Sequence, residues 1–165
     1  MGKFLVALDC TPASFKCIRY LCGVLKGNPG FDLILYHVLP TASPNLLKRE
    51  EVQRIERLHA EHPDLSGYFW KTEDEQAMNR FFEQARRELL EAGFKKSRIG
   101  VHFGVQSTEI SDLILEEAAG FGCSTIVLGR RRLSRVKELL QGSVSGSVVR
   151  LARGITVWVV DYRED

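Results

Sequence analysis

Apolar residues along the chain gather into short continuous runs, and helical patterns lie between these runs. The runs are Lys3–Leu8, Phe31–Leu39, Arg98–Val105, Ser124–Gly129 and Ile155–Val160. Short, almost unbroken apolar runs between turn residues predict strands that are covered on both faces. Because helical patterns separate the runs, we expect a parallel sheet with right-handed crossovers.

The first predicted helix lies between the first two strands. Thr11 is its expected N-cap, Pro12 suits the first turn because no amide donor is needed there, and Gly27 is expected to end it. The apolar positions that repeat at helical spacing within it are Ile18, Leu21, Cys22 and Leu25.

Similar signals predict the later helices. Thr72 and Glu75 form a capping box, Ser107 or Thr108 caps the next helix, and Ser143 caps the last one. Gly93 is expected to end the helix that Thr72 begins. The residues expected to face inward are Met78, Phe81, Phe82, Ala85 and Leu89, then Ile110, Leu113, Ile114 and Ala118, then Val144, Val148, Leu151 and Ala152.

The order of these elements predicts an α/β fold: a doubly wound, five-stranded parallel sheet with helices on both faces. The 165 residues are interpreted as a single domain, residues 1–165, with a variable insert at about 40–71.

Composition narrows the classes of partner. The net charge of +2 is too small to indicate nucleic-acid binding, and no stretch is long enough to span a membrane. The four cysteines form no C-x-x-C pair, and the His59/His62 pair lacks a matching ligand, so no metal site is expected. A reduced cytoplasm is the expected setting.

Ligands of an open α/β sheet bind outside the carboxyl ends of the strands, where the strand order reverses. The loop after the fourth strand has parts that suit phosphate. Gly129 would let the chain turn sharply, Gly142 would let backbone approach a ligand, and Ser143 and Ser145 offer hydroxyls beside the free amides of a helix start. The alternative to a phosphate site is that this loop is only a structural turn. No Walker lysine follows, and no G-x-G-x-x-G follows the first strand.

At this point the chain resembles the universal stress protein family. Nucleotide-binding members of that family carry G-x2-G-x9-G-[S/T] after strand four, and the corresponding residues here are Gly129, Arg132, Gly142 and Ser143. The opening "VALDCTPAS", the strand "LILYHV" and the segment "LLQGSVSGSVVRLA" are also similar to the family. The resemblance covers nearly the whole chain except residues 40–71.

The resemblance implies a Rossmann-like fold of the adenine nucleotide alpha hydrolase type and a pocket for ATP, possibly with Mg²⁺. It places Ala7 and Asp9 beside the adenine and ribose, and Val38 against the adenine through its backbone. The residues that it implies along the ribose and phosphates are Leu128, Gly129, Gly142, Ser143, Val144 and Ser145.

Arg132 departs from the family pattern, which has glycine at this position. Two interpretations remain open. The guanidinium can hold phosphate through paired hydrogen bonds, or its bulk and its poor fit to a positive φ angle can disrupt the turn.

Three functions compete. The first is a regulatory module that binds ATP or a related adenine nucleotide with little or no turnover, since no catalytic residue stands out and at most slow ATP hydrolysis is expected. The second is a nucleotide-free interaction protein with a protein partner. The resemblance implies a homodimer through the last strand, near Ile155, Val157, Trp158 and Val159, unless these residues only pack on the sheet's own helices.

An enzyme with a reactive thiol is the third and weakest candidate. Cys10 lies next to Asp9, whose charge would raise the pKa of the thiol, so a packed cysteine is favoured. His37 and His102 lie within apolar strand patterns, where hydrogen-bonded structural roles are expected.

Overall fold

The computed structural model of the chain describes residues 2–26, 30–39, 53, 57, 60, 72–105, 108–130 and 144–161. Apart from positions 53, 57 and 60, the predicted insert at 40–71 lies outside these ranges. The elements, in chain order, are β1 (Lys3–Ala7), α1 (Pro12–Leu25), β2 (Asp32–Leu39), α3 (Thr72–Glu91), the 3₁₀ turn η3 (Lys96–Arg98), β3 (Ile99–Val105), α4 (Ile110–Gly120), β4 (Thr125–Arg130), α6 (Val144–Leu151) and β5 (Thr156–Asp161). The predicted alternation of strands and helices is confirmed.

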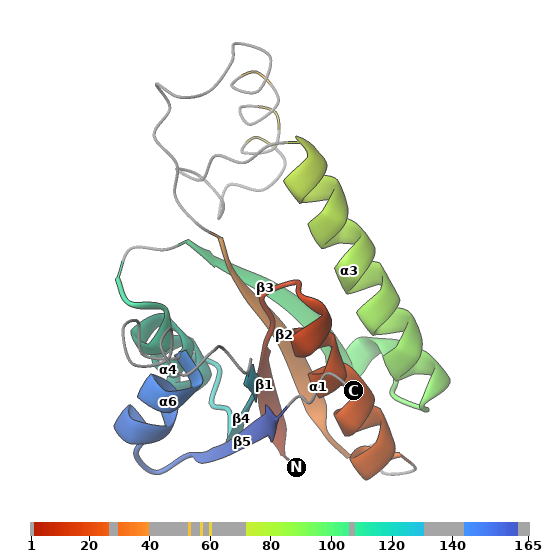
Figure 1. Cartoon of the computed structure of the whole chain (residues 1–165). Coiled ribbons are helices and arrows are strands. Elements are labelled where there is room, and N and C mark those ends of the chain that lie inside the picture. Colours follow the sequence, from red (N-terminus) through yellow and green to blue (C-terminus); the bar gives the residue numbers. More distant parts are fainter. Residues whose placement is uncertain are drawn as a thin grey trace.

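The five strands form one parallel sheet in the order β3-β2-β1-β4-β5. The chain therefore builds outward from β1 to β2 and β3, and then returns to the other side of β1 for β4 and β5. Figure 1 shows β1 between β2 and β4. The order reverses between β1 and β4, and this is where a doubly wound sheet places a ligand.

Helices cover both faces of the sheet. In Figure 1, α1 and α3 lie on one side, and α4 and α6 lie on the other. Side chains alternate along each strand, so neighbouring residues enter different cores. Leu5 of β1 belongs to the core beneath α4 and α6, and Val6 belongs to the core beneath α1 and α3. Both are 0% exposed, which explains the unbroken apolar run that predicted this strand.

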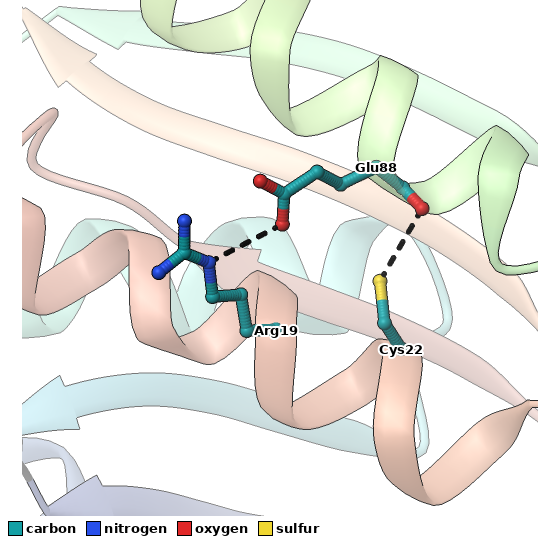
Figure 2. A network of polar contacts seen from close by, with 3 residues as sticks. All are labelled: Arg19, Cys22 and Glu88. Atoms are coloured by element: carbon teal, nitrogen blue, oxygen red, sulfur yellow. Dashed lines mark hydrogen bonds and ion pairs between the residues drawn. The ribbon is translucent and has the colours of Figure 1, made fainter.

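The two helices of one layer make both polar and apolar contacts (Figure 2). Arg19 Nε of α1 lies 3.5 Å from Glu88 Oε2 of α3, and Cys22 Sγ donates to the backbone carbonyl of Glu88 over 3.6 Å. An exposed ion pair contributes less than about 1 kcal/mol. The rings of Phe15 and Phe81 pack edge to face at 5.2 Å, so apolar burial does most to hold α3 against α1.

The predicted helix signals are met in part. Thr11 caps α1, since its Oγ1 accepts from the Ser14 amide over 3.3 Å, and Gly93 follows α3 with φ +96. Thr108 does not cap α4. The N-cap is Glu109, which makes no capping bond with its side chain.

The inward face predicted for the last helix is wrong at two positions. Val148 is fully buried, but Val144 is 41% exposed and Leu151 is 39% exposed. α6 has eight residues and packs on α4, β4 and β5 at the end of its layer. Only the strip that contains Ser145 and Val148 is buried, so the apolar positions on either side of it stay at the surface.

Candidate functional site

Three apolar residues meet where the strand order reverses. Ala7 of β1 is the register partner of Leu128 in β4 and of Tyr36 in β2. Val38 lies two residues beyond Tyr36 on the same face. Ala7, Val38 and Leu128 all pack with the core beneath α4 and α6. The structure thus brings these three predicted site residues together at the carboxyl edge of the sheet.

Asp9 lies in a tight turn between β1 and α1. Its Oδ1 accepts from the Thr11 backbone amide over 3.1 Å and from Thr11 Oγ1 over 2.5 Å. Cys10, between them, has φ 60, which is a left-handed conformation that L residues rarely adopt. The turn therefore fixes the Asp9 carboxylate, which is exposed, at the same edge as Ala7.

The backbone of Val38 faces the place where β1 has ended. The Leu8 amide donates to the Tyr36 carbonyl over 2.8 Å, so the peptide groups of Tyr36 point toward β1. Peptide directions alternate along a strand, so the N–H and C=O of Val38 point the same way. The next acceptor along that edge, the Leu8 carbonyl, accepts instead from His37 Nδ1 over 2.6 Å. Outside the strand-to-strand ladders, none of the backbone hydrogen bonds among the described residues involves the Val38 peptide groups. A donor and an acceptor are thus available side by side.

Cys10 and His37 lie near this edge but do not form a nucleophile and its base. Their Sγ and Nδ1 atoms are 3.8 Å apart. Because a carbonyl only accepts, Nδ1 carries the proton that it donates to Leu8 and has no lone pair for the thiol. Burial first, and the Asp9 charge second, raise the pKa of the Cys10 thiol to about 12. Burial also lowers the pKa of His37. The packed cysteine and the hydrogen-bonded histidine expected from the sequence are confirmed.

Gly129 has a different role from the predicted one. It lies inside β4, paired with Val160, rather than in a sharp turn after the strand. A Cβ at this position would approach the Ala13 carbonyl oxygen at 3.3 Å and Cys17 Sγ at 3.4 Å. The missing side chain lets the first turns of α1 pack closely on the backbone of β4.

The phosphate side of the predicted pocket is described only in part. Val144 and Ser145 begin α6, and Ser145 is buried whereas Val144 is exposed. Arg132, Gly142 and Ser143 lie outside the described residues. Their predicted contacts with phosphate, and both interpretations of Arg132, stay predictions.

Tyr36 lies near this edge, and the sequence pattern does not distinguish it from the apolar residues around it. Its ring is buried in the core beneath α4 and α6, and its pKa is raised to about 12 by burial first and then by the nearby Glu117 and Glu116. A polar aromatic residue inside the run "LILYHV" was the available signal.

The described residues hold neither a metal-binding cluster nor a membrane-spanning helix. They contain no group of three or more His, Cys, Asp or Glu side chains placed to hold a metal ion. None of the helices within them combines the length and the apolar character needed to cross a membrane.

Comparisons with known proteins agree on one fold. The sequence profile of the universal stress protein family matches residues 1–161. No curated protein matches the chain. A solved universal stress protein in complex with cAMP has 16% identity and a TM-score of 0.63, with 96% of this chain and 95% of the other covered.

Two further structures come from an archaeal and a plant protein named for their organisms. The universal stress protein from Archaeoglobus fulgidus in complex with dAMP has 17% identity and a TM-score of 0.59, over 96% of this chain and 97% of the other. A universal stress protein family protein from Arabidopsis thaliana with AMP bound has 15% identity and a TM-score of 0.61. The match covers 99% of this chain and 93% of the other. At these identities the structural matches establish the fold.

Proposed function

This chain belongs to the universal stress protein family, and we propose that it binds an adenine nucleotide at the carboxyl edge of β1, β2 and β4. Binding would regulate the protein's conformation or its partners, with little or no turnover. Solved relatives with the same fold hold cAMP, dAMP and AMP.

The observation that carries this proposal is the pair of peptide groups of Val38 that face the end of β1. The Watson–Crick edge of adenine offers an acceptor at N1 beside a donor at N6, which complements a peptide N–H and C=O on one strand edge. Ala7 and Leu128 provide apolar surface for the base on the same face. Asp9 lies within the same edge and is suited to accept from ribose hydroxyls.

We propose that the phosphates lie toward Gly129 and the start of α6. There Gly142, Ser143 and Ser145 would supply backbone amides and hydroxyls, and Arg132 would supply a guanidinium. ATP with Mg²⁺ is our preferred ligand, because the family pattern is retained at Gly129, Gly142 and Ser143. We expect slow turnover at most, because burial raises the pKa of the Cys10 thiol to about 12 and His37 Nδ1 is engaged by the Leu8 carbonyl, so neither side chain is placed to activate a nucleophile.

The protein purified without added nucleotide, then denatured and analysed by mass spectrometry, is expected to release an adenine nucleotide. Stripped protein is expected to gain about 2.7 kcal/mol of stability at a ligand concentration 100 times Kd, which raises Tm by about 5–10 °C. AMP, cAMP and ATP–Mg²⁺ are compared, with GTP–Mg²⁺ as the control. Clean protein with no Tm change in millimolar adenine nucleotide would contradict the proposal.

We propose second that two copies pair through β5. This strand lies at an edge of the sheet and hydrogen-bonds only β4 among the described strands. Val159 is 38% exposed on it, and Val149 of the neighbouring α6 is 53% exposed. An apolar edge strand with unpaired peptide groups favours pairing with another strand.

The Thr156 amide donates to the carbonyl of Ser124, the residue just before β4, so by alternation the Val159 amide points away from β4. Val159→Pro removes that outward donor and leaves the bonds to β4 intact. Light scattering is expected to give twice the mass of one chain for the parent and for the control Val159→Ala, and the mass of one chain for Val159→Pro. A monomeric parent would contradict the dimer.

A further inference from the structure

The hydrogen-bond ladder between β1 and β2 stops before its next regular bond. The Leu8 amide donates to the Tyr36 carbonyl over 2.8 Å, which extends the register of Ala7 with Tyr36 by one residue. In a parallel ladder that continued, the Val38 amide would donate to the Leu8 carbonyl. The backbone bonds that the described residues make at this strand end do not include that one. Something therefore takes the Leu8 carbonyl away from the strand edge.

His37 is the residue that holds this carbonyl. Its Nδ1–H donates to the Leu8 carbonyl oxygen over 2.6 Å. Side chains alternate along β2, so the His37 ring lies on the α1 and α3 side of the sheet, where it contacts Phe82 of α3. The carbonyl therefore tilts toward that side and away from the Val38 amide.

The neighbours of the imidazole fix this arrangement. The ring packs edge to face against Phe82 at 6.2 Å and against Phe103 of β3 at 6.5 Å. Cys10 has φ 60, so the chain turns away from β2 soon after Leu8. Burial lowers the pKa of His37, so the ring is neutral at neutral pH, and the Leu8 carbonyl selects the tautomer with the proton on Nδ1.

Resting on the proposed function, we infer that His37 is a positioning residue of the nucleotide site, because it holds the Leu8 carbonyl aside and so keeps the Val38 amide free for the base. Adenine N1 accepts from this amide in place of the carbonyl. His37 does not touch the ligand, since its ring lies on the other face of the sheet from Ala7 and Leu128. A histidine in one core thus prepares a donor for a ligand at the sheet edge.

The first test needs no ligand and follows hydrogen exchange of the Val38 amide by NMR. His37→Leu removes the donor, so the Leu8 carbonyl is expected to return to the Val38 amide. Exchange at Val38 is then expected to slow about tenfold or more, because a paired amide exchanges only when its bond opens. His37→Asn places a side-chain N–H near the position of Nδ1 and is expected to keep the fast exchange of the parent.

The matched control is His102→Leu. His102 is a histidine of β3 that contacts Glu117 and Phe121, on the α4 and α6 side of the sheet. Its replacement is expected to leave exchange at Val38 unchanged, because it makes no bond to the end of β1.

The second test is calorimetry with AMP. His37→Leu is expected to raise Kd about three- to tenfold, the range for one hydrogen bond, whereas His37→Asn and His102→Leu are expected to stay within about twofold of the parent. The analogue 1-deaza-AMP lacks N1 and is expected to bind the parent and His37→Leu equally well. A histidine that only supports the fold would weaken the binding of both ligands alike.

Three results would overturn the inference. The first is equal exchange at Val38 in the parent and in His37→Leu. The second is AMP binding that His37→Leu leaves intact, and this removes the inference alone. The third is a parent in which the ¹⁵N signals of the His37 ring place the proton on Nε2, a measurement that needs no variant to fold. Failure of the parent to bind AMP removes the proposed function and the inference together.

Discussion

Replacing Asp9 with alanine is expected to weaken AMP binding about 10- to 100-fold. A hydrogen bond to a charged group contributes about 1.5–3 kcal/mol, and each 1.4 kcal/mol is a factor of ten in Kd. The turn already orients the carboxylate through Thr11, so no reorganisation is required when a ribose hydroxyl approaches. Isothermal titration calorimetry with AMP measures the effect.

The Asp9→Asn substitution removes the negative charge and keeps the hydrogen bonds of the turn. The amide oxygen of asparagine can still accept from the Thr11 amide and hydroxyl, so the start of α1 is kept. We expect Asp9→Asn to bind AMP with an affinity between those of the parent and Asp9→Ala, and with a Tm close to that of the parent. Equal affinities for all three proteins would show that Asp9 does not contact the ligand.

Replacing Gly104 with alanine is expected to destabilise the fold by about 1–3 kcal/mol, the usual effect of overpacking a core. The new Cβ would lie 2.0 Å from Oη and 2.9 Å from Cζ of Tyr36. The ring is 1% exposed, so it cannot move aside into solvent. In a domain of this size the loss corresponds to a fall in Tm of about 3–10 °C, measurable by circular dichroism.

Gly100→Ala is the matched control, because Gly100 lies on the same face of β3. Its added Cβ would meet only the Leu33 carbonyl oxygen, at an ordinary 3.9 Å, so we expect a change within about 0.5 kcal/mol. Combining Gly104→Ala with Tyr36→Leu should recover part of the loss, since leucine lacks the outer ring atoms. Equal stability of Gly104→Ala and Gly100→Ala would refute the close approach of Tyr36 to β3.

The alternation of apolar runs and helical patterns predicted the sheet, its parallel strands and its helices on both faces. Strands such as β1 are buried on both sides, and this leaves a strong signal in sequence. Features that depend on neighbours far along the chain were missed. Gly129 resembles a turn residue in sequence, but its lack of a side chain serves the packing of α1. Leu151 fits an inward helical pattern, but nothing described covers that side of α6.

In the candidate site, too, the residues with local sequence signals were predicted and a residue that depends on distant neighbours was not. Asp9 at the end of β1 and Val38 near the end of β2 were placed at the edge by the sequence resemblance, and the structure brings them to neighbouring strands at that edge. Tyr36 was read only as part of an apolar strand. Its ring lies over Gly104, a glycine of β3, and this relation is not local in sequence.

The most direct test of nucleotide binding at this edge is an AMP titration followed by the backbone amide signals of ¹⁵N-labelled protein. The account predicts that the largest saturable shifts occur at Asp9, Val38 and Ser145, at the carboxyl ends of the strands and the start of α6. Amides at the opposite edge, such as Asp32 and Arg98, are expected to stay unchanged. An absence of saturable shifts, or shifts centred on Asp32 and Arg98, would contradict the account.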